Sequence, residues 1–214
     1  MFNLMEELKK EQLGLAKKVS TTNELNPEKL TTVGGTDQII VGKGVMAVIS
    51  VFTYPQLQEI EKKYATTDIT QRYNPGYSFY NEGSAIIEAF KKLEHKPDLL
   101  LVKGDGILHP RRIGIASHVG LELDIPTIGV AKAMLCGSLQ NDTVVVQGEP
   151  RGKLLVTKKV SNPIFISPGH KIGLDTSITL IKTLIIPPHK MPEPIAVSHK
   201  FLTKLKKFQK DKED

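Results

Sequence analysis

A short apolar run followed by two glycines is the feature that most constrains the fold of this chain. Residues 99–102 (LLLV) are apolar, and Gly104 and Gly106 follow directly. A run of this length with a β-branched residue is typical of a buried strand, and glycines after a strand let the backbone approach a ligand closely because no side chain intervenes. Since Pro110 suits the first position of a helix, we expect a buried strand, a glycine turn and a helix over residues 110–123.

The turn between this strand and this helix has two interpretations. A helix start beside a glycine-rich turn and two arginines, Arg111 and Arg112, is a natural binding place for a phosphate. An ordinary strand–turn–helix connection with a solvated arginine pair explains the same residues equally well. The local sequence leaves both interpretations open.

The hydrophobic pattern predicts further strands and helices on both sides of this segment. The expected strands are residues 31–40, 45–53, 57–68, 97–102, 125–131, 143–146, 153–159 and 164–166, although the Glu/Lys pairs within 57–68 also suit a helix. The expected helices are residues 3–19, 84–94, 110–123, 175–185 and a last helix from about 196. This order predicts one α/β domain over residues 1–214, a mixed β-sheet flanked by helices. Residues 1–25 would form an N-terminal helix and linker, and residues 199–214 a basic, solvated C-terminal tail.

The composition narrows the class of partner. The formal net charge is +6, and a basic surplus favours polyanions such as nucleic acid without proving them. The single cysteine, Cys136, excludes an internal disulfide and suits a reducing compartment, so we expect a cytoplasmic protein. No apolar run approaches the ~20 residues that span a bilayer, and Glu6 and Glu7 interrupt the pattern of a signal peptide. We therefore expect no membrane partner. We also expect a monomer.

Five short motifs follow one another along the chain. They are YNPG at residues 73–76, NEG at 81–83, HPRRIGIASHVGL at 109–121, IPTIGVAK at 125–132 and SPGH at 167–170. In order and spacing they resemble the endonuclease V family, whose members nick nucleic acid beside deaminated adenine (hypoxanthine). The resemblance extends over nearly the whole chain and implies a ribonuclease H-like fold.

The resemblance also implies a catalytic centre that contains a metal ion. Such nucleases gather carboxylates around Mg²⁺, for which Mn²⁺ can substitute. The family's metal ligands match Asp37 and Glu82, and its catalytic residues include Lys132 and His170. Without the resemblance these residues would be a surface aspartate at a strand end, a glutamate at a helix start that favours the helix dipole, an exposed lysine and an ordinary loop or core histidine.

One position departs from the family pattern. Lys103 stands where the family carries a metal-binding aspartate. Asp105 lies two residues later, and in an extended backbone its side chain would point to the same face as that of Lys103. We therefore expect Asp105 to compensate in part as a metal ligand, although the glycine turn around it works against this alignment.

The nucleic-acid contacts follow from the resemblance in the same way. The YNPG loop matches a wedge that separates the strands, for which an aromatic on a rigid turn is suited, although a tyrosine packed on its own domain is common. A pocket for the flipped base would use the backbone of two glycines and an isoleucine. The residues expected to contact nucleic acid are Tyr73, Pro75, Gly76, Gly104, Gly106, His109, Arg111 and Ile115.

Two classes of function are consistent with these residues. The first is a Mg²⁺-dependent endonuclease that cuts DNA on the 3′ side of deoxyinosine. The second is a binding module that captures inosine but cleaves weakly or not at all, because Lys103 replaces a metal ligand. The partner would be DNA that contains deoxyinosine, and inosine-containing RNA fits a basic groove as well.

Overall fold

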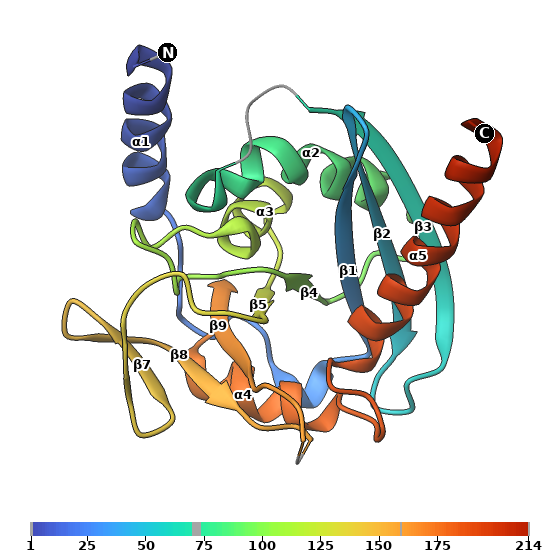
Figure 1. Ribbon diagram of the computed structural model, residues 1–214. Helices are drawn as coiled ribbons and strands as arrows, with labels where there is room; N and C mark the ends of the chain where they lie inside the picture. Colours follow the sequence, from blue (N-terminus) through green and yellow to red (C-terminus); the bar gives the residue numbers. More distant parts are fainter. Residues whose placement is uncertain (1, 70–73, 159, 214) are drawn as a thin grey trace.

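The computed structural model describes residues 2–69, 74–158 and 160–213 as one mixed sheet of nine strands with helices on both faces (Figure 1). Across the sheet the strand order is β3-β2-β1-β4-β5-β9-β8-β7-β6. The strands are β1 (Thr32–Val41), β2 (Gly44–Thr53), β3 (Glu59–Asp68), β4 (Leu99–Lys103), β5 (Thr127–Ala131), β6 (Ser138–Gln140), β7 (Thr143–Val146), β8 (Glu149–Leu155) and β9 (Ile164–His170). The helices are α1 (Phe2–Ala16), α2 (Ser78–Lys91), α3 (Ile115–Leu123), α4 (Leu174–Thr183) and α5 (Glu193–Glu213), with short 3-10 turns η1 (Pro27–Lys29) and η2 (Pro75–Tyr77). The expected α/β class is confirmed.

Strand β4 lies at the centre of the sheet and is buried on both faces. It pairs in parallel with β1 on one side and with β5 on the other. Leu99 and Leu101 pack with α4 and Ile195 of α5, whereas Leu100 and Val102 pack with α2 and α3. This alternation follows the two-residue period of a strand, and a strand covered on both faces is apolar throughout, as residues 99–102 are.

Helix α5 covers one face of β1 and β2 (Figure 1). Its residues from 199 onward were expected to form a solvated tail. Leu202 is buried against Met46 and Val48 of β2. The Ser198 hydroxyl donates to the Gly35 carbonyl of β1 at 2.7 Å. A Cβ on Gly35 would lie only 2.4 Å from the Pro194 carbonyl carbon, so the absent side chain lets the start of α5 approach β1 closely. The expectation of a solvated tail is therefore wrong at Leu202, whereas residues 203, 204 and 206–208 of α5 are exposed.

Three local expectations also differ from the structure. Helix α2 begins at Ser78 rather than at residue 84, because the Asn74 side chain accepts from Gly76 N at 3.1 Å and starts η2, which continues into α2. Helix α3 begins only at Ile115, so Pro110 lies in a turn before it and is not its first residue. The strand expected at residues 164–166 does not end there but continues through the SPGH motif. Its residues belong to strand β9, which pairs with β5 from Ala131 back to Thr127.

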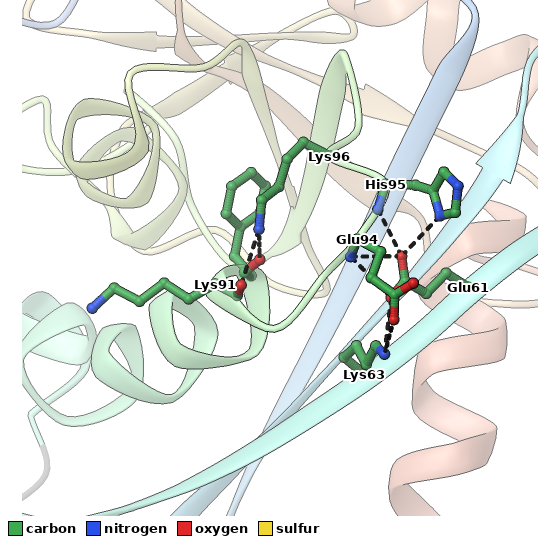
Figure 2. A network of polar contacts seen from close by, with 7 residues as sticks. Glu61, Lys63, Lys91, Glu94, His95 and Lys96 are labelled. Carbon is green, nitrogen blue, oxygen red and sulfur yellow. Dashed lines mark hydrogen bonds and ion pairs between the residues drawn. The ribbon is translucent and has the colours of Figure 1, made fainter.

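A polar network joins β3 to the connection between α2 and β4 (Figure 2). The Glu61 carboxylate accepts hydrogen bonds from the backbone N–H groups of Glu94 and His95, at 3.0 Å and 2.9 Å, and from the Lys63 ammonium at 3.2 Å. Burial alone would raise the pKa of Glu61, but these hydrogen bonds outweigh it and lower the pKa from 4.5 to about 2. Lys96 donates to the Phe90 carbonyl at 2.6 Å and so satisfies the end of α2.

No helix within the described ranges is long and apolar enough to cross a membrane.

Candidate active site

The middle of β1 and the carboxyl end of β4 bring Asp37 and Lys103 together. Asp37 is fully buried, and its Oδ1 lies 2.5 Å from Lys103 Nζ and accepts from Gln38 N at 2.7 Å. Its Oδ2 lies 2.5 Å from Nδ1 of His199, which α5 places over β1. A charge buried in this way is costly unless it is paired, and here the aspartate has two cationic or proton-donating partners. His199 is a site residue that the sequence analysis missed.

Gln38 connects this group to Glu82. Its side-chain amide donates to Glu82 Oε2 at 2.9 Å and to the Lys103 carbonyl at 2.8 Å. Burial raises the pKa of Glu82, and the negative charge of Asp37 adds to this, while the Gln38 hydrogen bond and the Lys103 charge oppose it. Glu82 lies in the second turn of α2 and not at a helix start. The Glu82 side chain therefore reaches Gln38 of β1 and does not stabilise the first turn of its own helix.

A cavity of about 220 Å³ opens beside Glu82 and Lys103. It brings together seven of the residues singled out in the sequence, although these come from α2, α3 and three separate loops or strand ends. The seven are Pro75, Glu82, Lys103, Gly104, Asp105, Ile115 and Lys132. Apolar and charged groups thus meet in one small hollow, as is common in ligand sites.

Gly104 shapes the floor of this cavity. Its φ angle is +143°, which side chains rarely adopt, and a Cβ there would lie 2.4 Å from Cγ2 of Ile115. Glycine therefore leaves a flat strip of backbone next to an isoleucine. Such a surface is suited to a planar group, and the role in base binding that the resemblance implies for Gly104 and Ile115 stays a prediction.

Asp105 faces the same cavity without a partner among the described residues. Its Oδ1 is buried and accepts no hydrogen bond there. Burial raises the pKa of this carboxyl to about 7. An unpartnered buried oxygen in a cavity is unusual and points to a group that is held from outside the chain.

The remaining expected contact residues hold the loop around η2 in place. Arg111 donates to the Gly76 carbonyl at 2.6 Å and to Gln12 of α1, and its guanidinium lies 4.3 Å from the Tyr77 ring centroid. The His109 ring lies 3.1 Å from the same carbonyl. Burial, and then the charge of Arg111, lowers the pKa of His109 to about 4, so the ring is neutral at pH 7. These side chains are engaged within the protein.

Arg112 and Gly106 are also engaged within the protein. Arg112 pairs with Glu149 at 3.0 Å, so the arginine pair is not simply solvated, and its interpretation as a phosphate site stays a prediction. Gly106 N donates to the Ser167 hydroxyl at 2.8 Å, and a Cβ on Gly106 would lie 2.0 Å from the Pro168 carbonyl oxygen. Its glycine is needed for packing against β9 and not for a base.

His170 lies near the amino end of β5, at the opposite end of the strand from Lys103, so its assignment to the catalytic centre is wrong. In β9 it is opposite Thr127, the first residue of β5, whereas Lys103 is opposite Val130 near the end of that strand. Its Nδ1 accepts from Ser20 N at 3.2 Å. The histidine therefore fixes the segment that follows α1. Tyr73 lies outside the described residues, so its expected role as a wedge stays a prediction.

The residues present do not fit the Mg²⁺ ion that the family resemblance implies. Both Asp37 oxygens are engaged by Lys103 and His199, and Glu82 accepts from Gln38. Within residues 2–69, 74–158 and 160–213, no group of three acidic, histidine or cysteine side chains is placed to hold a metal ion. A fixed ammonium 2.5 Å from the aspartate supplies the positive charge that an ion would otherwise bring.

Acids and lysines at the carboxyl end of parallel strands, in a mixed sheet covered by helices, define an α/β domain of the ribonuclease H-like class. Within that class the chain belongs to the endonuclease V family, whose sequence model matches residues 14–200. The family is one of nucleases, as its name states.

Three relatives illustrate this membership. Endonuclease V of Dictyoglomus turgidum is 37% identical over 203 residues, which are 91% of this chain and 87% of that protein. The crystal structure of endonuclease V from Bacillus subtilis is 27% identical with a TM-score of 0.89, covering 97% of this chain and 94% of that one. Endonuclease V of Ciona intestinalis, solved with a 23mer DNA that contains an inosine followed by a ribo-adenosine, has a TM-score of 0.87. It is 23% identical, covers 97% of this chain and 98% of that one, and supports the fold alone.

Proposed function

We propose that this chain binds DNA that contains deoxyinosine and nicks it weakly on the 3′ side of the lesion. The observation that carries the proposal is the ion pair between Lys103 and Asp37, at 2.5 Å, on the rim of the 220 Å³ cavity. Membership of the endonuclease V family supports inosine as the target, and another member of the family, from Ciona intestinalis, was solved with DNA that contains inosine.

The cavity would receive the base after it leaves the helical stack. Enzymes that act on or read a single base extrude it into a pocket that stacks on apolar groups and reads its polar edge. Here Gly104 and Ile115 provide the flat apolar floor, and Ser78 and Glu82 provide polar groups beside it. Pro75 borders the opening of the same cavity.

Lys103 and Lys132 would hold the phosphate next to that base. Both ammonium-bearing side chains line the cavity, and Lys132 is exposed. A fixed Lys103 charge also opposes a divalent ion, because two like charges about 4 Å apart repel by roughly 4 kcal/mol at an effective dielectric near 20. That repulsion corresponds to roughly a thousandfold in ion affinity. Binding should therefore depend little on Mg²⁺, and cleavage should be slow.

A second candidate is an efficient endonuclease that uses Mg²⁺ or Mn²⁺. The unpartnered, buried Oδ1 of Asp105 favours it, since that carboxylate faces the same cavity as Glu82. In this case Asp105 would replace the aspartate that Lys103 displaces. Inosine-containing RNA presents the same base and belongs among the substrates to be compared.

The deciding experiment combines nicking and binding on duplex DNA with one deoxyinosine, with Mg²⁺, with Mn²⁺ and with EDTA. Lys103→Asp should raise Mg²⁺-dependent nicking by about a hundredfold or more. In EDTA it should weaken binding to inosine DNA and to matched adenine DNA by the same factor, because the phosphate loses a cationic contact while the base pocket is unchanged. Lys91→Asp makes the same charge change on the exposed side of α2, where Lys91 pairs with Glu88, and should alter neither.

The opposite result would replace the first candidate by the second. If the parent protein nicks efficiently with Mg²⁺ and Lys103→Asp adds nothing, Lys103 does not limit the reaction. Asp105→Asn should then abolish cleavage while leaving binding to inosine DNA in place.

A further inference from the structure

A second cavity, of about 440 Å³, opens on the other side of Lys103 and Lys132. Asp37 of β1 and the first two turns of α5 border it, together with residues 189–191 just before α5. Among the residues that the structure describes, only these two lysines line both this cavity and the 220 Å³ cavity. Its volume lies within the roughly 300–1,000 Å³ that is usual for small-molecule sites.

The charges around the larger cavity leave a positive surplus. Its two carboxylates already have partners, because Asp37 contacts Lys103 and His199, and Glu193 lies 2.5 Å from His189. The remaining cations are Lys132, Lys190 and Lys200, and none of them forms an ion pair with a residue in the described part of the chain. An anionic group is therefore favoured here.

One wall of the same cavity is apolar. It is formed by Ile195 and Val197 in the first turns of α5 and by Met191 just before that helix. A bare inorganic anion would gain nothing from such a wall, whereas burial of apolar surface favours a flat, weakly polar group. A phosphate joined to a base and sugar matches both the cationic rim and the apolar wall.

We propose that the larger cavity holds the nucleotide that follows the bound phosphate on its 3′ side. The strand would cross over Lys103 and Lys132, with the inosine base in the smaller cavity and the next part of the strand in the larger one. The polarity rests on the proposed function, which places inosine in the smaller cavity and the cut on its 3′ side. Lys190 and Lys200 then act as binding residues for the 3′ part of the strand.

The test compares two single-stranded oligonucleotides in EDTA. One ends with the 3′-phosphate of its inosine nucleotide, and the other continues for two more nucleotides. The parent protein should bind the longer strand about tenfold more tightly, a gain in the range expected for one stacked base and its phosphate. Lys190→Ala and Lys200→Ala should each remove most of that gain and leave affinity for the shorter strand unchanged.

A matched control lies one turn further along the same helix. Lys204 is exposed on α5 and does not line the cavity, so Lys204→Ala should keep the full gain. As competitors, deoxyadenosine 5′-monophosphate should displace the longer strand at lower concentration than inorganic phosphate. Equal displacement by both would show a site for phosphate alone and overturn the assignment of a nucleotide.

The outcomes separate this inference from the proposed function. If inosine strands bind better than matched adenine strands but the 3′ extension adds nothing, the inference is overturned and the function stands. The inference is also overturned if Lys204→Ala removes the extra affinity for the longer strand as fully as Lys190→Ala does. If neither strand shows a preference for inosine, the proposed function fails, and the assigned polarity fails with it.

Discussion

Two clusters in this molecule contain the same three residue types, a carboxylate with a lysine and a histidine, yet they differ in what surrounds them. In one cluster, Glu61 and Lys63 lie on the edge strand β3 and His95 in the connection after α2 (Figure 2). In the other, Asp37 of β1, Lys103 of β4 and His199 of α5 meet over the central strands. The Glu61 carboxylate rests mainly on backbone N–H groups, with side-chain partners at 3.2 Å and 3.3 Å. The Asp37 carboxylate has side-chain partners at 2.5 Å from two other elements.

The difference separates a structural cluster from a functional one. Backbone donors cannot move away without unfolding the connection after α2, so the Glu61 group closes that connection over β3. The cations around Asp37 border cavities, with the Lys103 side chain 26% exposed while Asp37 is 0% exposed. A cation at such a position can share its charge between the aspartate and a bound phosphate. Residue types alone do not distinguish the clusters, but burial and adjoining space do.

Loss of the lysine should affect stability most where the carboxylate is buried. Lys103→Met should lower the free energy of unfolding by about 3 kcal/mol, since it leaves the Asp37 charge with His199 and one backbone donor. Lys63→Met should cost less than about 1 kcal/mol, because the Glu61 backbone hydrogen bonds remain. Urea unfolding curves measure both. Equal losses of unfolding free energy for the two variants would mean that the lysine contributes equally to stability in both clusters.

Acid should weaken the Glu61 cluster in a defined range of pH. The pKa of Glu61 falls from 4.5 to about 2 on folding, so its contribution is complete above pH 4.5 and is lost as the pH drops toward 2. Glu61→Gln should therefore cost about 1 kcal/mol at pH 7 after screening, and almost nothing near pH 2. The exposed neighbour Glu59 is the control, and Glu59→Gln should show no such convergence. A cost for Glu61→Gln that persists unchanged at low pH would contradict this assignment.

The smallest expected effect concerns the salt dependence of binding to inosine duplex. Lys132→Ala should reduce the slope of log affinity against log salt by about 0.9, the contribution of one neutralised phosphate. Between 50 and 200 mM salt this amounts to roughly a threefold difference. Lys63→Ala, in the structural cluster, should leave the slope as it is. If both variants change the slope alike, the contrast between the clusters does not extend to nucleic acid.

The sequence predicted those parts of the fold that depend on local pattern. The apolar run at residues 99–102 is β4, and the strands expected at 31–40 and 45–53 are β1 and β2. The predicted helix boundaries were wrong where a side-chain hydrogen bond sets the start of a helix. The Asn74 side chain accepts from Gly76 N, and α2 begins at Ser78, six residues before the predicted start at residue 84. Pairing with β5 likewise drew residues 167–170 into a strand, which periodicity over four residues cannot indicate.

The site was predicted in part for the same reason. Asp37 was singled out by the family resemblance, but its histidine partner lies 162 positions away, and no local pattern joins the two. One signal was present in α5. Ile195, His199 and Leu202 follow at intervals of four and three, which places the histidine beside the buried face of the helix. A polar residue at such a position is a candidate for pairing with a buried charge.

The close approach of α5 to Gly35 has a consequence for the order of events on the ribosome. Strands β1 and β2 leave the exit tunnel long before Pro194 and His199 are made, so the face that α5 will cover is first exposed. Until then Asp37 lacks its histidine, and Met46 and Val48 lack the helix that buries them. A chain released before α5 is made would expose this apolar surface to chaperones and proteases. Such a chain would be degraded before it could act with an incomplete site.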